Sequence, residues 1–167
     1  MPMVKARCSA CGAAIEVAVS EPFAGAELAA PLCRACTDCQ FLDGGGAILQ
    51  LRHEVEGARF PLGRVTITGG AVEALATASE HAASFLARHA RGDWGENGNF
   101  EQIELTEEER RRGWEATDDC GKINKSNVLG RRDRIMSEYR TARGSRLWVI
   151  TCLDRGGSTT VLLPEEY

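Results

Sequence analysis

Two Cys-x-x-Cys pairs near the N-terminus carry the most specific chemical signal in this sequence. The pairs are Cys8 with Cys11 and Cys33 with Cys36. Each pair places two thiolates on one tight turn, and the spacer between the pairs lets the turns face each other, as in a zinc ribbon. Four thiolates complete a tetrahedral Zn²⁺ site without an open position for water. We therefore expect a structural metal that stabilises a segment too small to bury its own core.

Other cysteine chemistry competes with this zinc site. Reduced thiols or a disulfide pair are alternatives, but doubled Cys-x-x-Cys spacing without a secretory signal favours the metal. The run Cys33-x-x-Cys36-x-x-Cys39 is similar to the start of an iron–sulfur motif, yet it lacks a fourth close cysteine followed by proline. Cys39 is then a spare thiol or a substitute ligand. Cys152 lies in an apolar stretch and is expected to be a small core residue.

Positive charge is concentrated in one segment, although the chain as a whole carries a net charge of −4. Between Lys122 and Arg146 there are eight basic and two acidic residues. Such an excess can neutralise phosphates, but a solvated surface, or docking against the acidic stretch 67–120 of the same chain, explains it equally well. The residues predicted to contact nucleic acid are Lys122, Lys125, Arg131, Arg132, Arg134 and Arg143.

A second candidate chemistry is metal-independent cleavage of RNA. It requires a base for the 2′-hydroxyl, an acid for the leaving oxygen and cations that stabilise the phosphorane. His89 is the candidate base or acid, Arg134 or Arg140 the charge stabiliser, and Tyr139 the orienting residue. The structural alternative is that His89 hydrogen-bonds the terminal carbonyls of a helix.

A hairpin and a first helix are expected to precede these residues. Gly44-Gly45-Gly46 is predicted to be a hinge. Residues 47–56 and 64–68 are strand-like and separated by turn-forming residues, so we expect them to pair. An alanine-rich helix then begins at Gly69-Gly70.

Two further helices are expected to follow. His81–Arg91 is predicted to be helical and to end at Gly92, with Ser79 as its N-terminal cap. Thr106–Glu109 has the form of a capping box and is predicted to start a charged helix that continues to Trp114.

The final third of the chain is predicted to be an antiparallel meander. Its strands are expected at 135–141, 147–153 and 159–163. In the middle strand, successive side chains alternate between the two faces of the sheet, so Trp148 and Val149 lie on opposite faces. We expect one face to pack on helices and the other to stay accessible. Helices followed by strands predict the α+β class. We expect two domains, a zinc ribbon at 1–43 and an α+β domain at 44–167.

Four short motifs stand out in the second half of the chain. They are His89-Ala-Arg-Gly92-Asp93-Trp94-Gly95, Ser137-Glu-Tyr139, Leu147-Trp148-Val-Ile150-Thr151 and Thr159-Thr160-Val-Leu-Leu-Pro164-Glu-Glu-Tyr167. Together they resemble a group of small proteins encoded on bacterial plasmids, phages and integrated elements, whose function is largely unassigned. The resemblance covers roughly 60–167, although the connector 99–119 is longer and more charged than in such proteins. The order of a helical segment and a meander also resembles, in outline, barnase-like and ribosome-dependent toxin ribonucleases.

Three functions follow from these observations. The preferred interpretation is a zinc-binding adaptor of a mobile element that binds nucleic acid or a nucleic-acid-handling protein. The alternatives are a metal-independent ribonuclease and a protein inhibitor of a host factor. The sequence contains neither a secretory signal core nor an apolar run long enough to span a bilayer, so we expect a cytoplasmic protein without a membrane partner.

Overall fold

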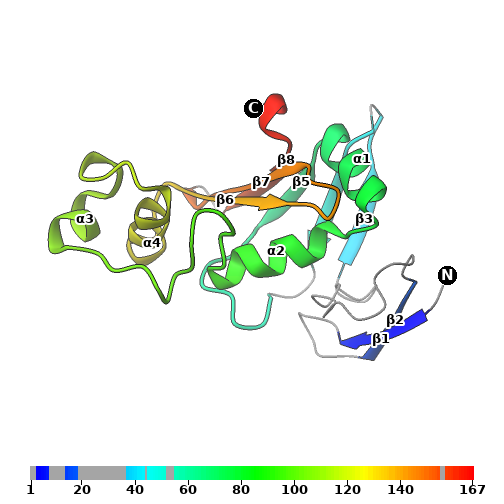
Figure 1. Ribbon diagram of the computed structural model, residues 1–167, viewed down its shortest axis with the longest axis horizontal. Helices are drawn as coiled ribbons and strands as arrows, with labels where there is room; N and C mark the ends of the chain where they lie inside the picture. Colours follow the sequence, from blue (N-terminus) through cyan, green and yellow to red (C-terminus); the bar gives the residue numbers. More distant parts are fainter. Residues whose placement is uncertain (1–2, 8–13, 19–36, 44, 52–54, 155–156) are drawn as a thin grey trace.

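The fold places one mixed β-sheet between a helix on one side and the C-terminal segment on the other (Figure 1). A computed structural model describes residues 3–7, 14–18, 37–43, 45–51, 55–154 and 157–167. Within these residues the class is α+β, as predicted. The predicted zinc ligands, and Gly44 of the predicted hinge, lie outside them; the ligands are Cys8, Cys11, Cys33 and Cys36.

Strands form the central layer. Their bounds are β1 (Met3–Arg7), β2 (Ala14–Ala18), β3 (Thr37–Phe41), β4 (Ala47–Leu51), β5 (Arg64–Ile67), β6 (Arg134–Arg140), β7 (Arg146–Cys152) and β8 (Ser158–Leu162). In the described part of the chain, β1 and β2 pair with each other, and the main sheet has six strands in the order β3-β4-β5-β8-β7-β6. Neighbours in this sheet are antiparallel except β5 and β8, which run parallel.

The predicted strands 64–68, 135–141, 147–153 and 159–163 are confirmed to within one residue. The predicted strand 47–56 is confirmed over Ala47–Leu51, and residues 52–54 lie outside the described ones. The β6-β7-β8 meander is antiparallel, and the β4-β5 hairpin forms as expected. The sheet extends beyond the predicted domain boundary, because β3 lies before residue 44 and pairs with β4. Cys39 belongs to β3 and is opposite Leu49. The sheet of the α+β domain therefore begins at Thr37.

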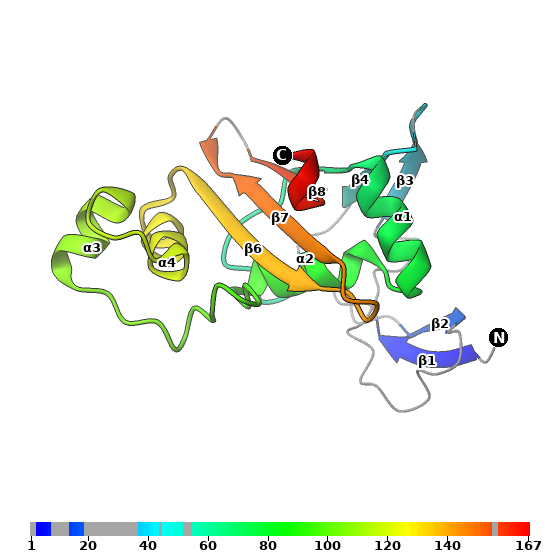
Figure 2. The same ribbon diagram turned by 45° about the horizontal axis from the view of Figure 1, so that its top comes forward.

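Helices and short 3-10 turns surround the sheet. They are α1 (Gly69–Ala78), α2 (Ala82–Arg91), α3 (Glu107–Arg112), η1 (Gly113–Glu115), α4 (Cys120–Gly130) and η3 (Pro164–Glu166). Figure 2 shows α3 and α4 together at the end of the sheet where β6 begins. Within the described residues, no helix combines the length and apolar character needed to cross a bilayer.

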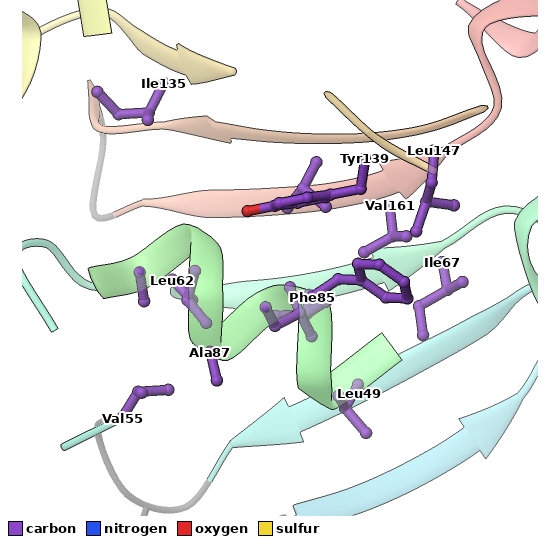
Figure 3. Packing of buried hydrophobic residues seen from close by; sticks show 14 of the residues in the cluster. Leu49, Val55, Leu62, Ile67, Phe85, Ala87, Ile135, Tyr139, Leu147 and Val161 are labelled. Atoms are coloured by element: carbon purple, nitrogen blue, oxygen red, sulfur yellow. The ribbon is translucent and has the colours of Figure 1, made fainter. Parts of the chain in front are cut away.

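The hydrophobic core lies between α2 and one face of the sheet, which we call the inner face. Phe85 of α2 and Tyr139 of β6 have ring centroids 5.3 Å apart, and Figure 3 shows both side chains in this layer. Burial of such side chains is the main favourable contribution to folding. Other buried members include Leu49, Leu62, Val65, Ile67, Leu86, Ile135, Leu147, Val149 and Val161.

Local capping explains where the helices begin and end, and corrects one prediction. Ser79 does not cap α2: it follows α1 in the left-handed conformation, and His81 precedes α2. The other signals are confirmed. Gly92 ends α2 with φ 90°, and Thr106 and Glu109 form the predicted capping box of α3.

Helix α4 was not predicted, because its sequence is rich in poor helix formers. Asn124, Ser126 and Asn127 lie in its interior, and such side chains often compete with the helical backbone for hydrogen bonds. Here all three are buried and bond to other elements. Asp119 caps the helix by accepting from the Lys122 amide. Tertiary contacts therefore override a weak local propensity.

Candidate functional site

His89 belongs to a buried chain of hydrogen bonds on the inner face. The Leu62 carbonyl accepts from Thr159 Oγ1 at 2.6 Å, so Thr159 accepts from Thr151 at 2.7 Å. Thr151 then accepts from His89 Nε2 at 2.9 Å, and Nδ1 accepts from Ser137 Oγ at 2.5 Å. This direction assigns the proton to Nε2. Burial lowers the pKa of His89 to about 3, so the ring is neutral.

The predicted catalytic residues do not lie on one accessible surface. His89 is 0% exposed, and Tyr139 is buried, with its hydroxyl donating to the Asp93 carbonyl at 2.5 Å. Arg134 and Arg140 are exposed at opposite ends of β6. An RNA hydroxyl cannot reach the His89 ring unless the core opens. The geometry therefore favours the structural interpretation of His89, although its partners are hydroxyls and not helix carbonyls.

Several of the cations predicted to bind phosphate are engaged within the fold. Lys122 Nζ lies 2.8 Å from Glu109 Oε1. Lys125 Nζ donates to the Phe100 and Ile103 carbonyls, each at 2.7 Å. Arg132 Nη2 donates to the carbonyls of Arg110 and Arg111 and to Ser126 Oγ, thereby joining α3 to α4. These bonds hold the helices together and occupy N–H donors that an anionic partner would need, and the pair with Glu109 also offsets the charge of Lys122.

The remaining predicted cations are spread over different parts of the surface. Arg143 lies in the turn between β6 and β7. Arg131 follows α4 with φ 50° and contributes to a cavity of about 390 Å³ that Arg59 and Phe60 also line. Arg134 lines a different cavity. Arg143 is therefore separated from Arg134 by the length of β6.

The structure contains an apolar groove on the outer face of the sheet, the face opposite α2. The groove has a volume of about 450 Å³, within the range of ligand pockets. The sheet contributes Met136, Trp148 and Ile150. The alternation of β7 predicted that one face of this strand is accessible. Cys152 lies on this half-exposed face, so the expectation that it is a core residue was wrong. We call this cavity the outer-face groove. Its other lining residues are Trp114, Cys120, Ile123, Asn124, Asn127, Asp133, Arg134 and Tyr167.

Side-chain amides hold the α4 wall of the groove against the edge of β6. Asn124 exchanges two hydrogen bonds with the Met136 backbone. Asn127 Nδ2 donates to the Arg134 carbonyl at 2.8 Å, and Asn97 Nδ2 donates to the Met136 carbonyl at 2.9 Å. These amides satisfy backbone groups that an edge strand leaves open, and so protect the edge from pairing with another chain.

Aromatic side chains form the rim of the groove. Trp114 is 65% exposed and Tyr167 is 71% exposed. The Tyr167 ring contacts Trp148 edge to face, with centroids 5.8 Å apart. The Trp148 indole donates to Glu138 Oε2, and Arg146 donates to both oxygens of the same carboxylate. The bond from Arg146 lowers the pKa of Glu138, so Trp148 keeps an ionised acceptor.

The C-terminal segment is fixed by one carboxylate. Glu166 accepts from Thr68 Oγ1 at 2.5 Å and from the amides of Gly70 and Leu163 at 3.0 and 2.8 Å. It therefore serves as an anionic cap at the start of α1. A Cβ on Gly70 would lie 2.6 Å from Glu166 Oε1, so a side chain there would displace this carboxylate. The cap places Tyr167 beside the groove.

Cys120, the cysteine that lines the groove, is poorly suited to act as a nucleophile. Burial, and the nearby charges of Asp119 and Glu138, raise the pKa of Cys120, which keeps its thiol protonated and poorly nucleophilic. In the part of the chain that the structure describes, no cluster of three His, Cys, Asp or Glu side chains could hold a metal. Sequence reasoning missed the groove because α4 was not predicted. The sequence signal that could have indicated the groove was Trp148, a large aromatic residue on the accessible face of β7.

Comparison with known protein families, with characterised proteins and with solved structures finds no match. Function must therefore be inferred from the geometry of the outer-face groove.

Proposed function

We propose that the α+β domain is a noncatalytic binding module that docks a segment of a partner protein in the outer-face groove. The observation that carries this proposal is an apolar groove of about 450 Å³ with two highly exposed aromatic side chains at its rim. Apolar depressions with exposed aromatic residues at their rim are typical of interaction sites. In this proposal the chain is an adaptor, as expected from its sequence.

The composition of the rim supports a protein partner. Trp114, Tyr167 and Arg134 belong to the three residue types most enriched among the residues that dominate protein–protein affinity. The sheet side adds Ile150 and Met136, which provide apolar area for a partner's side chain. The β6 edge is already paired with amide side chains, so docking would use side chains in the groove and not strand addition.

Charge argues against nucleic acid as the occupant of this groove. Of the cations predicted to contact phosphate, only Arg134 lines it. Lys122, Lys125 and Arg132 are bonded within the fold. A nucleic acid would gain few phosphate contacts here, whereas phosphate contacts supply most nonspecific affinity.

The zinc ribbon remains a proposal from the sequence. Cys8, Cys11, Cys33 and Cys36 would hold one structural Zn²⁺ and stabilise the N-terminal segment. We propose that the chain acts in the cytoplasm and that its partner is a nucleic-acid-handling protein. In the alternative in which the chain inhibits a host factor, that factor would bind in the same groove.

Peptide selection tests the docking proposal. A phage-displayed library of random linear peptides is selected on the purified wild-type chain. We expect convergence on sequences with a large apolar residue, and loss of their binding in Trp114→Ala. Leu129→Ala is the matched control, because Leu129 is exposed on α4 but does not line the groove. Selection without convergence, or equal binding to both variants, would refute the proposal.

A further inference from the structure

Arg134 lies at the groove without a carboxylate partner in the part of the chain that the structure describes. Arg112, Lys122 and Arg146 each form an ion pair. Among the described residues, no such pair within 4.0 Å involves Arg134, whose Nη1 donates only to the Tyr167 hydroxyl, at 2.6 Å. A guanidinium has five N–H donors. Most of the donors of Arg134 are therefore available at the groove.

Asp133 also lines this end of the groove, next to Arg134 in sequence. It has φ 57° and is exposed. Its carboxylate repels an acidic ligand and partly offsets the attraction of Arg134. The two residues therefore make opposite contributions, which can be measured separately.

We infer that the groove selects a peptide segment in which a large apolar side chain is followed closely by a carboxylate. The apolar side chain contacts Trp148 and Ile150, and the carboxylate binds the Arg134 guanidinium. A peptide segment supplies both groups at close spacing. This inference rests on the proposed function and specifies the chemistry of its partner.

Matched peptides test the carboxylate preference. A peptide selected on the wild-type chain is synthesised with blocked ends, and its acidic residue nearest the apolar anchor is replaced by the corresponding amide in a second peptide. We expect the acidic peptide to bind about 2- to 5-fold more tightly, the effect of one exposed ion pair. Arg134→Gln should abolish this difference, and Asp133→Asn should increase it.

The outcomes separate the two proposals. Selected peptides without an acidic residue, or equal affinities of the two matched peptides for the wild-type chain, would overturn the carboxylate inference and leave peptide docking in place. A preference that persists in Arg134→Gln would also overturn the inference. Selection that yields no groove-dependent peptide would refute both. Thermal unfolding of each variant shows whether the fold is intact.

Discussion

The side chain of Asn124 makes the two hydrogen bonds with the Met136 backbone that a neighbouring strand would otherwise make. Its Nδ2 donates to the Met136 carbonyl at 2.7 Å, and its Oδ1 accepts from the Met136 N–H at 2.9 Å. The residue lies in α4, so the pair fixes this helix to the edge of β6. Two of the hydrogen bonds that hold the groove wall therefore come from one buried amide.

We expect Asn124→Ala to lower the free energy of unfolding by about 1–3 kcal/mol, because the Met136 N–H loses its acceptor in a partly buried site. Denaturant unfolding and amide exchange at Met136 measure the effect. Asn97→Ala is the control: it removes a second bond to the Met136 carbonyl, which still accepts from Asn124, so its cost should be smaller. Equal costs for the two variants would contradict this account.

Stability should fall with acidification because of His89. Its pKa is about 3 in the folded chain and about 6.5 when unfolded. Between these values the unfolded chain binds a proton that the folded chain does not. The free energy of unfolding therefore decreases as the pH falls below about 6.5, by up to about 1.4 kcal/mol per pH unit from this group.

Urea unfolding between pH 4.5 and 6.5 measures the His89 contribution above the range where most carboxylates titrate. His89→Gln should be less stable at neutral pH and should lose this pH dependence. His81→Gln is the control, because His81 is exposed, and it should retain the wild-type dependence. A slope that persists in His89→Gln would show that another group is responsible.

Gly95 is predicted to be intolerant of a side chain. It has φ 62°, and an added Cβ would lie 2.1 Å from the Glu138 carbonyl oxygen, where the 93–99 loop contacts β6. Gly95→Ala should cost ~3 kcal/mol or more. Gly57→Ala has a similar φ of 74° but open space around the new Cβ, so it should cost about 1–2 kcal/mol. Thermal unfolding compares them, and similar losses would contradict the steric argument.

Zinc binding is predicted from the cysteine pairs. Metal analysis of the purified, reduced chain should find one Zn²⁺ per molecule, and Cys33→Ser should reduce this content strongly. Cys120→Ser is the control and should keep its zinc, because this thiol lines the outer-face groove and is not one of the four predicted ligands. A chain that carries iron, or that keeps its zinc in Cys33→Ser, would contradict the four-cysteine assignment.

Elements with a clear local periodicity were predicted correctly from the sequence. Elements whose conformation depends on tertiary contacts were not predicted. The alternation in β7 and the glycine after α2 are local signals, and both were correct. Asn124 and Asn127 were not predicted to be helical, because the hydrogen bonds to β6 that stabilise them there involve residues outside the local sequence. His89 was placed at a helix end, but its burial depends on Ser137 and Thr151 from distant strands. The groove was missed for the same reason.

The three indole N–H resonances test the central claim of peptide docking most directly. Trp114 and Trp148 line the groove, whereas Trp94 is 0% exposed in the core and serves as an internal control. Titration of the isotope-labelled chain with a selected peptide should shift the Trp114 and Trp148 signals in a saturable manner and leave Trp94 unchanged. Unchanged signals from Trp114 and Trp148, or shifts caused equally by single-stranded RNA, would contradict the assignment of the groove to a protein partner.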